Sequence, residues 1–388
     1  MAPRHALRIT WAASVSAVNS EDWNSLARPL ATPFLEYEWL SLLERSGSVC
    51  PETGWDPQYL LVSRDSRLVA ACPLYRKTHS EGEFVFDYMW TEAAGKMGIR
   101  YFPKLVGMSP VTPVEAFQFL IHPEENREEM TEYLCRLIVE RARELGLGGI
   151  HFQYVDPAWG AFLTRHGFTG WEHPCYLWTN PGYDSFEGFL SRFSKNTRRN
   201  IRREEASVAG QGITVHVLTG EDIDPGWHAL MHRYYLNTNE KFGYWAALYL
   251  TGDFFRGLFR EFRHRLALAA AFRVGETQPL AMALFLTKHD RLWGRYWGGR
   301  TFVPHLHFNV CYYAPFRWAI AHGIRYFDPG IGAEHKARRG FVARPVVSLH
   351  RFVDPRLDRL FRANVDTLNA YTRHAIAELN AGKKPEGW

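Results

Sequence analysis

The sequence of 388 residues predicts an α+β fold of two similar units in tandem, each built around a mixed central sheet. Three observations predict this fold class. The length suffices for two domains of ordinary size. Hydrophobic residues make up 46% of the chain and aromatic residues 15%, which is typical of a globular protein with a large core. One order of strands and helices occurs twice, at an offset of about 174 residues, as duplication of a unit would produce.

The repeated order is clearest in two pairs of segments. Residues 59–75 and residues 266–287 each predict two antiparallel strands joined by a tight polar turn. Residues 128–155 and residues 307–328 each predict a helix that ends at glycine and is followed by a strand. Because the two halves match weakly residue by residue, coincidence is the alternative to duplication.

The segments outside this repeat also predict regular structure. Residues 9–18 predict a first strand, followed by a helix that Ser20 caps. Residues 184–212 predict a basic amphipathic helix, because phenylalanine and leucine recur there at helical spacing. Its five cations are Lys195, Arg198, Arg199, Arg202 and Arg203. These cations form either a solvated face paired with Glu204 and Glu205, or a stripe that faces phosphate or RNA.

These elements predict a first domain at residues 1–180 and a second domain at residues 181–388, which opens with the basic helix and carries the site. The first domain contains an extra segment near residues 78–118, rich in aromatic residues, glycine and proline. Five cysteines without a C-x-x-C pair favour a reducing compartment, so we expect a cytoplasmic protein. No apolar run reaches the roughly twenty residues of a membrane span. A net charge of +5 permits an RNA, a phosphorylated cofactor or an anionic lipid surface as partner.

The order of elements is similar to that of the N-acyltransferase fold of the GNAT superfamily. In that fold the strand before the central helix splays from its neighbour, so its free N–H groups can hold an acyl carbonyl. The strand would be residues 291–299 here, and the loop that faces the carrier's phosphates would be residues 300–306. This loop lacks the Q/R-x-x-G-x-G/A pattern usual in acetyl-CoA enzymes, which makes CoA-dependent acetylation less expected.

Long motifs that are typical of one protein family lie at residues 73–90, 101–105, 109–115, 180–204, 292–299, 303–313 and 334–341. They resemble a bacterial family of predicted N-acyltransferases, described as GNAT-like or peptidoglycan-biosynthesis-like, and the resemblance covers nearly the whole chain. The chain is more distantly similar to the Fem peptidyltransferases, tandem GNAT-fold enzymes that move an amino acid from aminoacyl-tRNA onto an amine of a peptidoglycan precursor.

One Fem feature carries over to a residue of this chain. Fem enzymes have an F-K-x-x-F-G stretch after a late strand, and its lysine is thought to stabilise charge during transfer. HKARRGF, residues 335–341, is a loose match, which implies this role for Lys336. The chain departs from the nearer family at EAFQFL, residues 115–120, and at DPGIGAEHK, residues 328–336. Both departures suggest a specialised member and leave the acceptor open.

Amide formation needs a group that removes a proton from the attacking amine. The candidate bases are Asp328, Glu334, His335, His305 and His307, of which we favour Glu334 and His335. The alternatives are that Glu334 forms a salt bridge and that Asp328 binds backbone N–H groups. The H-L-H at His305 and His307 has no third ligand at recognisable spacing, so we expect no metal.

Further residues are candidates for holding the donor. Lys336, Arg338 and Arg339 neutralise a carrier phosphate or an oxyanion, or else form a solvated basic turn. The remaining donor-binding candidates are Tyr296, Trp297, Gly298, Arg300, His305 and His307. The aromatic residues among them, like Trp293, Tyr312 and Tyr313, are more often core than substrate platform.

The leading hypothesis is an aminoacyl-tRNA-dependent transferase that forms an amide on a small-molecule, peptide or cell-envelope amine, with no cofactor. An enzyme with an acyl-CoA or carrier-protein thioester donor is the first alternative. A non-catalytic protein that binds RNA or a membrane surface is the second, and peripheral membrane contact stays open.

Overall fold

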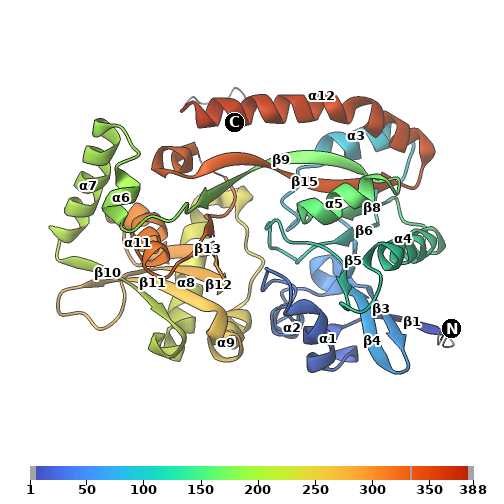
Figure 1. Cartoon of the computed structure of the whole chain (residues 1–388), viewed down its shortest axis with the longest axis horizontal. Helices are drawn as coiled ribbons and strands as arrows, with labels where there is room; N and C mark the ends of the chain where they lie inside the picture. Colours follow the sequence, from blue (N-terminus) through green and yellow to red (C-terminus); the bar gives the residue numbers. More distant parts are fainter. Residues whose placement is uncertain (1–5, 333, 383–388) are drawn as a thin grey trace. The chain divides into compact units, whose positions relative to one another are not determined.

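The computed structural model describes residues 6–332 and 334–382 (Figure 1). The chain forms two compact units, and each mixes strands with helices. The first unit comprises Met1–Pro174 and Pro345–Ile376, and the second comprises Cys175–Arg344 and Ala377–Trp388. This division differs from the expected domains 1–180 and 181–388, because the segment from Pro345 returns to the first unit. Phe361 shows why, since its ring packs on Trp90 of the first unit at 4.8 Å between centroids.

The first unit contains two groups of strands. Its strands are β1 (Leu7–Ala12), β2 (Trp55–Pro57), β3 (Tyr59–Arg64), β4 (Arg67–Cys72), β5 (Leu74–Lys77), β6 (Lys104–Gly107), β7 (Leu120–Ile121) and β8 (Gly149–Phe152). Its helices are α1 (Ser20–Ala27), α2 (Tyr37–Arg45), α3 (Tyr88–Lys96), α4 (Arg127–Glu144) and α5 (Pro157–Thr164), with 3-10 turns at Val15–Ala17 and Pro51–Thr53. Strands β1, β3, β4 and β7 follow one another in antiparallel order, while β2, β5, β6 and β8 form a mixed group in which β6 and β8 are parallel.

The second unit has a mixed sheet in the order β10-β11-β12-β13-β14. Its strands are β10 (Ile213–Thr219), β11 (Leu266–Arg273), β12 (Ala281–Lys288), β13 (Arg291–Gly299) and β14 (Tyr326–Asp328). Its helices are α6 (Phe186–Leu190), α7 (Lys195–Ala209), α8 (His228–Asn239), α9 (Gly252–Glu261), α10 (Leu306–Phe308) and α11 (Ala314–Ala321), with a π-helical turn at Asn309–Tyr313 and 3-10 turns at Gly220–Asp222, Pro225–Trp227, Glu240–Trp245, Arg263–Arg265 and Glu334–Arg339. Three elements cross from one unit to the other along the chain: β9 (Thr169–Thr179), β15 (Val342–Phe352) and α12 (Pro355–Asn380).

Both predicted hairpins and both predicted helix–strand segments are confirmed. Strands β3 and β4 pair in the first unit and β11 and β12 pair in the second, as the alternating patterns indicated. Helix α4 begins where the Asn126 side chain accepts from the amides of Glu128 and Glu129, and it buries Leu134 and Ile138. In the second unit, α11 ends before Gly323, which adopts a φ of +67°.

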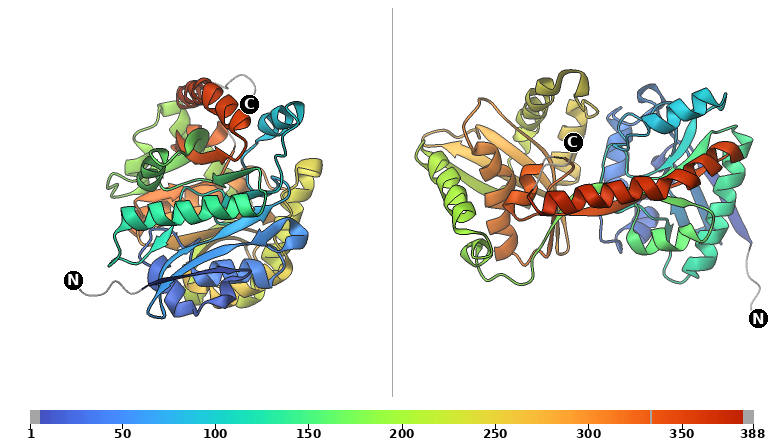
Figure 2. Two further views of the ribbon diagram at one scale, coloured as in Figure 1. Left: turned by 90° about the vertical axis from the view of Figure 1, so that its right-hand side faces the viewer. Right: turned by 90° about the horizontal axis from the view of Figure 1, so that it is seen from above.

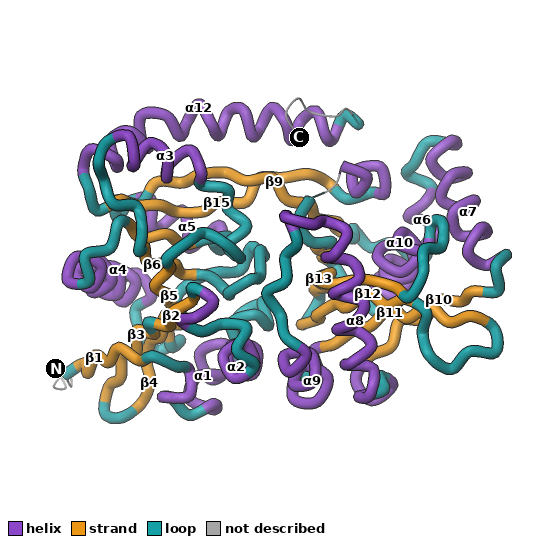
Figure 3. Tube along the Cα trace, turned by 180° about the vertical axis from the view of Figure 1, so that it is seen from behind, coloured by secondary structure: helices purple, strands orange, loops and turns teal. Residues whose placement is uncertain are grey.

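Helices cover both faces of the second unit's sheet. Helix α8 packs on β13, and the π-helical turn before α11 packs on β11 and β12. Figure 2 shows α8 (yellow-green) and α11 (orange) on opposite sides of these strands, and α8 lies in front of them in Figure 3. A Cβ at Gly298 would lie 2.0 Å from the backbone oxygen of Tyr234, so glycine at this position lets α8 approach β13. Gly298 was a candidate for binding the donor, but close packing of α8 on β13 is enough to explain why this position is glycine.

Two predicted segments differ from the structure. Residues 184–212 form two helices instead of one, because Ser185 caps α6 and Ser194 starts α7 with a hydrogen bond from the Thr197 amide. The extra segment near residues 78–118, for which no element was predicted, contains α3 and β6. Strand β6 lies between β5 and β8 and so is part of the sheet. Ser20 is the first residue of α1, and Asn19 is its cap. Among the described helices, none is both long enough and apolar enough to span a bilayer.

Candidate active site

Strands β13 and β14 of the second unit separate from one another. They pair in parallel only at Arg291 with Tyr326, Leu292 with Phe327 and Trp293 with Asp328. Strand β14 ends there because Pro329 lacks an N–H, whereas β13 continues to Gly299. The pairing thus stops while β13 runs on, as the splay expected from the GNAT-like order of elements requires. The segment from Asp328 to Phe341 begins at this point of the chain.

Lys336 is the most buried cation of that segment. Only 4% of the residue is exposed, and its Nζ donates to the carbonyl oxygens of Gly330 at 2.8 Å and Ile331 at 2.9 Å. The ring of Tyr176 lies 5.7 Å from Nζ. Burial lowers the pKa of Lys336 to about 8, although the nearby Asp328 carboxylate opposes this shift. An ammonium group has three N–H donors, so one remains without an acceptor among the described residues.

Asp328 closes the turn from which Lys336 takes its two carbonyl partners. Its Oδ1 accepts from the Gly330 amide at 2.7 Å, and this bond holds the turn that follows β14. The backbone-binding alternative is thus confirmed for Asp328. Burial raises the pKa of Asp328, while the Gly330 amide, Arg295 and Lys336 act in the opposite direction. The carboxylate is therefore a stronger base than an exposed aspartate.

His335 lies beside aromatic side chains and approaches Tyr312. Its Nε2 is 3.0 Å from the Tyr312 hydroxyl, and the rings of His335 and His307 are 5.6 Å apart. Burial lowers the pKa of His335 to about 4, and the charges of Arg339 and Lys336 contribute to the shift. Burial also lowers the pKa of His307 to about 3. Both imidazoles are neutral at pH 7 and have a lone pair that can accept a proton.

Glu334 does not have the environment expected of the base. Its side chain is exposed, and it makes no salt bridge within the part of the chain that the structure describes. The partly buried glutamate that was favoured as a base is therefore not found, and neither is its alternative, a salt bridge to Lys336 or Arg338. Arg338 is also exposed, so it lies in solvent beside the site.

Arg339 holds the site together instead of facing a substrate. Its guanidinium donates from Nη2 to both Glu204 oxygens at 3.1 Å, from Nε to the Tyr313 hydroxyl at 3.0 Å and from Nη1 to the His335 carbonyl at 3.1 Å. It also lies 3.4 Å from the centre of the Phe308 ring. We call Glu204, Tyr313 and Arg339 the clamp. It ties α7 and the π-helical turn to the residue before Lys336, which corrects the donor-binding role expected for Arg339.

The other donor-binding candidates have ordinary structural partners. Tyr296 packs on Tyr235, at 5.4 Å between ring centroids, and Trp297 packs on His307 at 4.4 Å. Arg300 pairs with Glu276 at the surface. His305 adopts a φ of +64°, and its carbonyl accepts from Asn309 at the start of the helix. Among the described residues, no group of three or more His, Cys, Asp or Glu suited to a metal ion occurs.

The cations of α7 divide into two sets. Arg198 donates to the carbonyl of Phe193, and Arg202 pairs with Glu187 at 2.6 Å. Lys195, Arg199 and Arg203 are exposed and make no ion pair in the described structure. They lie one helical turn apart, so they share a face. We call these three residues the α7 stripe. Glu204 does not pair with it, since Glu204 points inward to the clamp, and Glu205 pairs with Arg317.

Sequence reasoning missed the residues that support Lys336 from other elements. Tyr312, Tyr313 and Glu204 contact the segment through side chains, and Arg295 lies close enough to influence the pKa of Asp328 and Lys336. Tyr312 and Tyr313 were assigned to the core, and Glu204 was treated as a partner for surface cations. The one available signal was a glutamate on the apolar side of an otherwise basic helix.

Comparison with known proteins supports the fold. No curated protein matches the chain. Similar solved structures include that of FemX, with 12% identity and a TM-score of 0.53 over 88% of this chain and 98% of that one. The C-terminal domain of a putative lysylphosphatidylglycerol synthetase from Agrobacterium fabrum has 10% identity and a TM-score of 0.52, over 91% and 97%. A protein of unknown function from Bacteroides thetaiotaomicron has 12% identity and a TM-score of 0.51, over 89% and 99%.

At these identities the likeness shows the fold alone. Together with the strand order, it shows a Fem-like α+β fold built from two units with mixed sheets. The FemAB-like family, described as acting in peptidoglycan biosynthesis and recognition, matches residues 14–385. The chain therefore belongs to the FemAB-like family.

Proposed function

We propose that the protein transfers an aminoacyl group from aminoacyl-tRNA onto an amine, and that Lys336 stabilises the negative charge that develops in this reaction. The observation that carries the proposal is the buried Lys336 ammonium beside the β13–β14 splay, with two N–H groups held by Gly330 and Ile331 and the third without an acceptor among the described residues. A fixed cation in a partly dry site stabilises an oxyanion more than it would in water.

In this reaction the amine attacks the aminoacyl ester carbonyl, a C–N bond forms and the C–O bond to the ribose breaks. The amine's proton must reach the leaving ribose oxygen. We assign its removal to His335, which is neutral at pH 7 and 3.0 Å from the Tyr312 hydroxyl, although its pKa of about 4 makes it a weaker base than an exposed histidine. Asp328 is the second candidate base, because burial raises its pKa.

Two features favour tRNA over CoA as the donor. The loop at residues 300–306 lacks the Q/R-x-x-G-x-G/A pattern that is usual in acetyl-CoA enzymes. The α7 stripe offers three exposed cations that make no ion pair among the described residues, so they are available to the phosphates of a nucleic acid. Family membership supports a peptidoglycan-type precursor as the acceptor. Five cysteines without a C-x-x-C pair favour a reducing, cytoplasmic compartment for the reaction.

The donor is tested with radiolabelled aminoacyl-tRNA and an extract of low-molecular-mass cell-envelope precursors. We expect label to move into a product that resists mild base, because an amide survives conditions that hydrolyse the ester. Pretreatment of the donor with ribonuclease should abolish this transfer. Transfer that survives ribonuclease, or that occurs only with acyl-CoA, would show that the thioester alternative is correct.

The α7 stripe is tested by the triple substitution of Lys195, Arg199 and Arg203 to glutamine. It should raise the KM for charged tRNA and reduce its salt dependence, because fewer phosphates are neutralised. The same substitutions should leave kcat nearly unchanged. A matched control replaces three exposed cations of α12 in the first unit, Arg356, Arg359 and Arg362, and should not change the KM for tRNA.

A further inference from the structure

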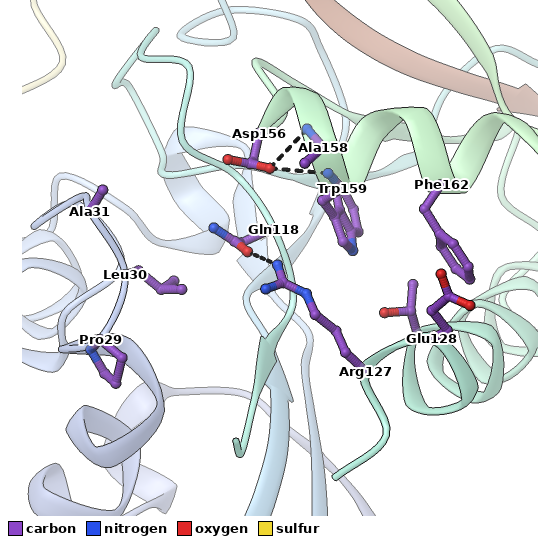
Figure 4. Close-up of a pocket in the computed structure, with 11 residues that line it drawn as sticks. Pro29, Leu30, Ala31, Gln118, Arg127, Glu128, Asp156, Ala158, Trp159 and Phe162 are labelled. Carbon is purple, nitrogen blue, oxygen red and sulfur yellow. Dashed lines mark hydrogen bonds between the residues drawn. The ribbon is translucent and has the colours of Figure 1, made fainter. Parts of the chain in front are cut away.

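A cavity of about 540 Å³ lies in the first unit, whereas Lys336 belongs to the second (Figure 4). The loop after α1 forms one wall, and the starts of α4 and α5 form the others. Every residue that lines it belongs to the first unit. Its size is within the usual range for small-molecule sites, about 300–1,000 Å³.

The backbone hydrogen bonds of the first unit argue against a carrier groove at this cavity. The corresponding backbone segments of the first unit are hydrogen-bonded together, from the Phe117 amide to the Tyr154 carbonyl at 3.1 Å and from the Asp156 amide to the Phe117 carbonyl at 2.9 Å. Both helix starts are already capped, α4 by Asn126 and α5 by Asp156. A phosphate would therefore meet the Asp156 carboxylate where free helix N–H groups would otherwise attract it.

Two hydrogen-bond donors line the cavity without a full set of partners: in the described ranges of the chain, one has no acceptor, and the other is a cation without an anion. The residue Trp159 is only 3% exposed, and its indole Nε1 has no partner in the described structure. A buried donor left unpaired costs about 1–3 kcal/mol. Arg127 donates to the neutral Gln118 amide oxygen and makes no ion pair among the described residues. Figure 4 shows the Trp159 ring reaching between Arg127 and Phe162.

The position of Arg127 is also electrostatically unfavourable. It is the first residue of α4, where the helix dipole is positive and a cation is destabilising. Locally unfavourable groups of this kind are common at functional sites. An anion in the cavity would pair with Arg127 and could accept from Trp159 Nε1.

The remaining groups restrict the anion. The Asp156 Oδ1 accepts from the amides of Ala158 and Trp159, which leaves its second oxygen to accept an N–H from a ligand. Leu30 and Phe162 provide apolar surface. The two anionic groups Asp156 and Glu128 disfavour a doubly charged ligand, so a singly charged carboxylate that carries an N–H fits best.

We propose that this cavity binds the carboxylate and the adjacent N–H of an amino acid, either free or as the carboxyl end of a short peptide. The carboxylate lies against Arg127 and Trp159 Nε1, the N–H donates to Asp156, and the side chain packs on Leu30 and Phe162. This site is separate from the proposed transfer reaction and does not depend on it.

Calorimetry with the full chain tests the proposal with four probes: L-alanine, N-acetyl-L-alanine, L-alaninamide and inorganic phosphate. We expect saturable binding of at least one of the first two and none of the amide or phosphate. Preference for L-alanine indicates a free amino acid, and preference for N-acetyl-L-alanine indicates a peptide carboxyl end. The absence of binding by both carboxylates at about 10 mM, or equally tight binding of phosphate, would overturn the proposal.

Substitutions locate the binding within the chain. Arg127→Gln should weaken carboxylate binding by about tenfold or more, since it removes a charge-assisted hydrogen bond. Arg136→Gln removes the same charge from an exposed position of α4 and should leave the affinity unchanged. Lys336→Met should also retain binding, which separates this cavity from the site in the second unit. Unchanged affinity in Arg127→Gln, with thermal unfolding like that of the unmodified chain, would show that the ligand binds elsewhere.

Discussion

At the scale of single residues, the chemistry depends on how the protein sets the charge of Lys336. Burial alone would remove the proton from a lysine, whereas the two carbonyl partners and Asp328 retain it. The result is a pKa of about 8. Because this value still lies above 7, Lys336 remains mainly cationic at pH 7. Asp328 therefore acts on Lys336 in two ways, through its charge and through the turn that its bond to Gly330 holds.

This balance predicts the titration of Lys336. Labelling with an amine-reactive reagent at several pH values, followed by peptide mass spectrometry, should give a midpoint near a pKa of about 8 for Lys336. In Asp328→Asn the midpoint should fall, because the substitution removes the charge that favours the ammonium and retains an oxygen for the Gly330 amide. A midpoint that stays the same in Asp328→Asn would contradict the assigned role of Asp328.

At the scale of elements, the clamp fixes α7 against the segment that carries Lys336. Glu204 and Arg339 are both nearly buried, with side-chain exposures of 12% and 10%. Removing one partner of a buried ion pair leaves an uncompensated charge and typically costs about 3–5 kcal/mol. Glu204→Gln should therefore lower the free energy of unfolding by about 3 kcal/mol, as measured by urea denaturation.

The neighbouring residue provides the matched control. Glu205 pairs with Arg317, whose side chain is 49% exposed, and such surface pairs contribute about 0–1 kcal/mol. Glu205→Gln should accordingly have little effect. Equal destabilisation by the two substitutions would mean that the clamp has no special role.

The elements also show what could be predicted from the sequence. Periodicity predicted α4, the two hairpins and β13, because the buried residues of each element recur at regular spacing within one stretch of sequence. It did not predict the break between α6 and α7, since the spacing of Phe186, Phe189 and Phe193 continues across it and only the Ser194 cap marks it. The clamp could not be predicted, because Glu204 and Arg339 are 135 positions apart and no local pattern connects them.

At the scale of the whole molecule, the chain does not divide at one point. A single boundary near residue 180 was the natural expectation. However, most of β15 and most of α12 belong to the first unit, although they follow the second unit in the sequence. Each unit also contains histidines that burial keeps neutral. His173 in the first unit has a pKa lowered to about 4, as does His335 in the second, and that of His307 is lowered to about 3.

These histidines predict that the protein loses stability in mild acid. An unfolded histidine takes up a proton near pH 6.5, but the folded state does so only near pH 4 for His173 and His335. Between these values the unfolded chain binds more protons, so the free energy of unfolding falls as the pH falls, by about 1–2 kcal/mol per histidine at pH 5. Urea denaturation from pH 7.5 to pH 4.5 measures this. His335→Gln should reduce the slope, and a stability that is constant or higher at pH 5 would contradict the prediction.

The central claim is that Lys336 serves an amide-forming transfer, and mass spectrometry of reaction products tests it most directly. The protein is incubated with charged tRNA and the precursor extract, and the products of the unmodified chain are compared with those of Lys336→Met and of Lys96→Met, an exposed lysine of α3. We predict a new species heavier by one aminoacyl residue with the unmodified chain and with Lys96→Met. With Lys336→Met we predict a rate lower by about 100-fold or more. No such product from the unmodified chain, or an equal rate in a folded Lys336→Met variant, would contradict the account.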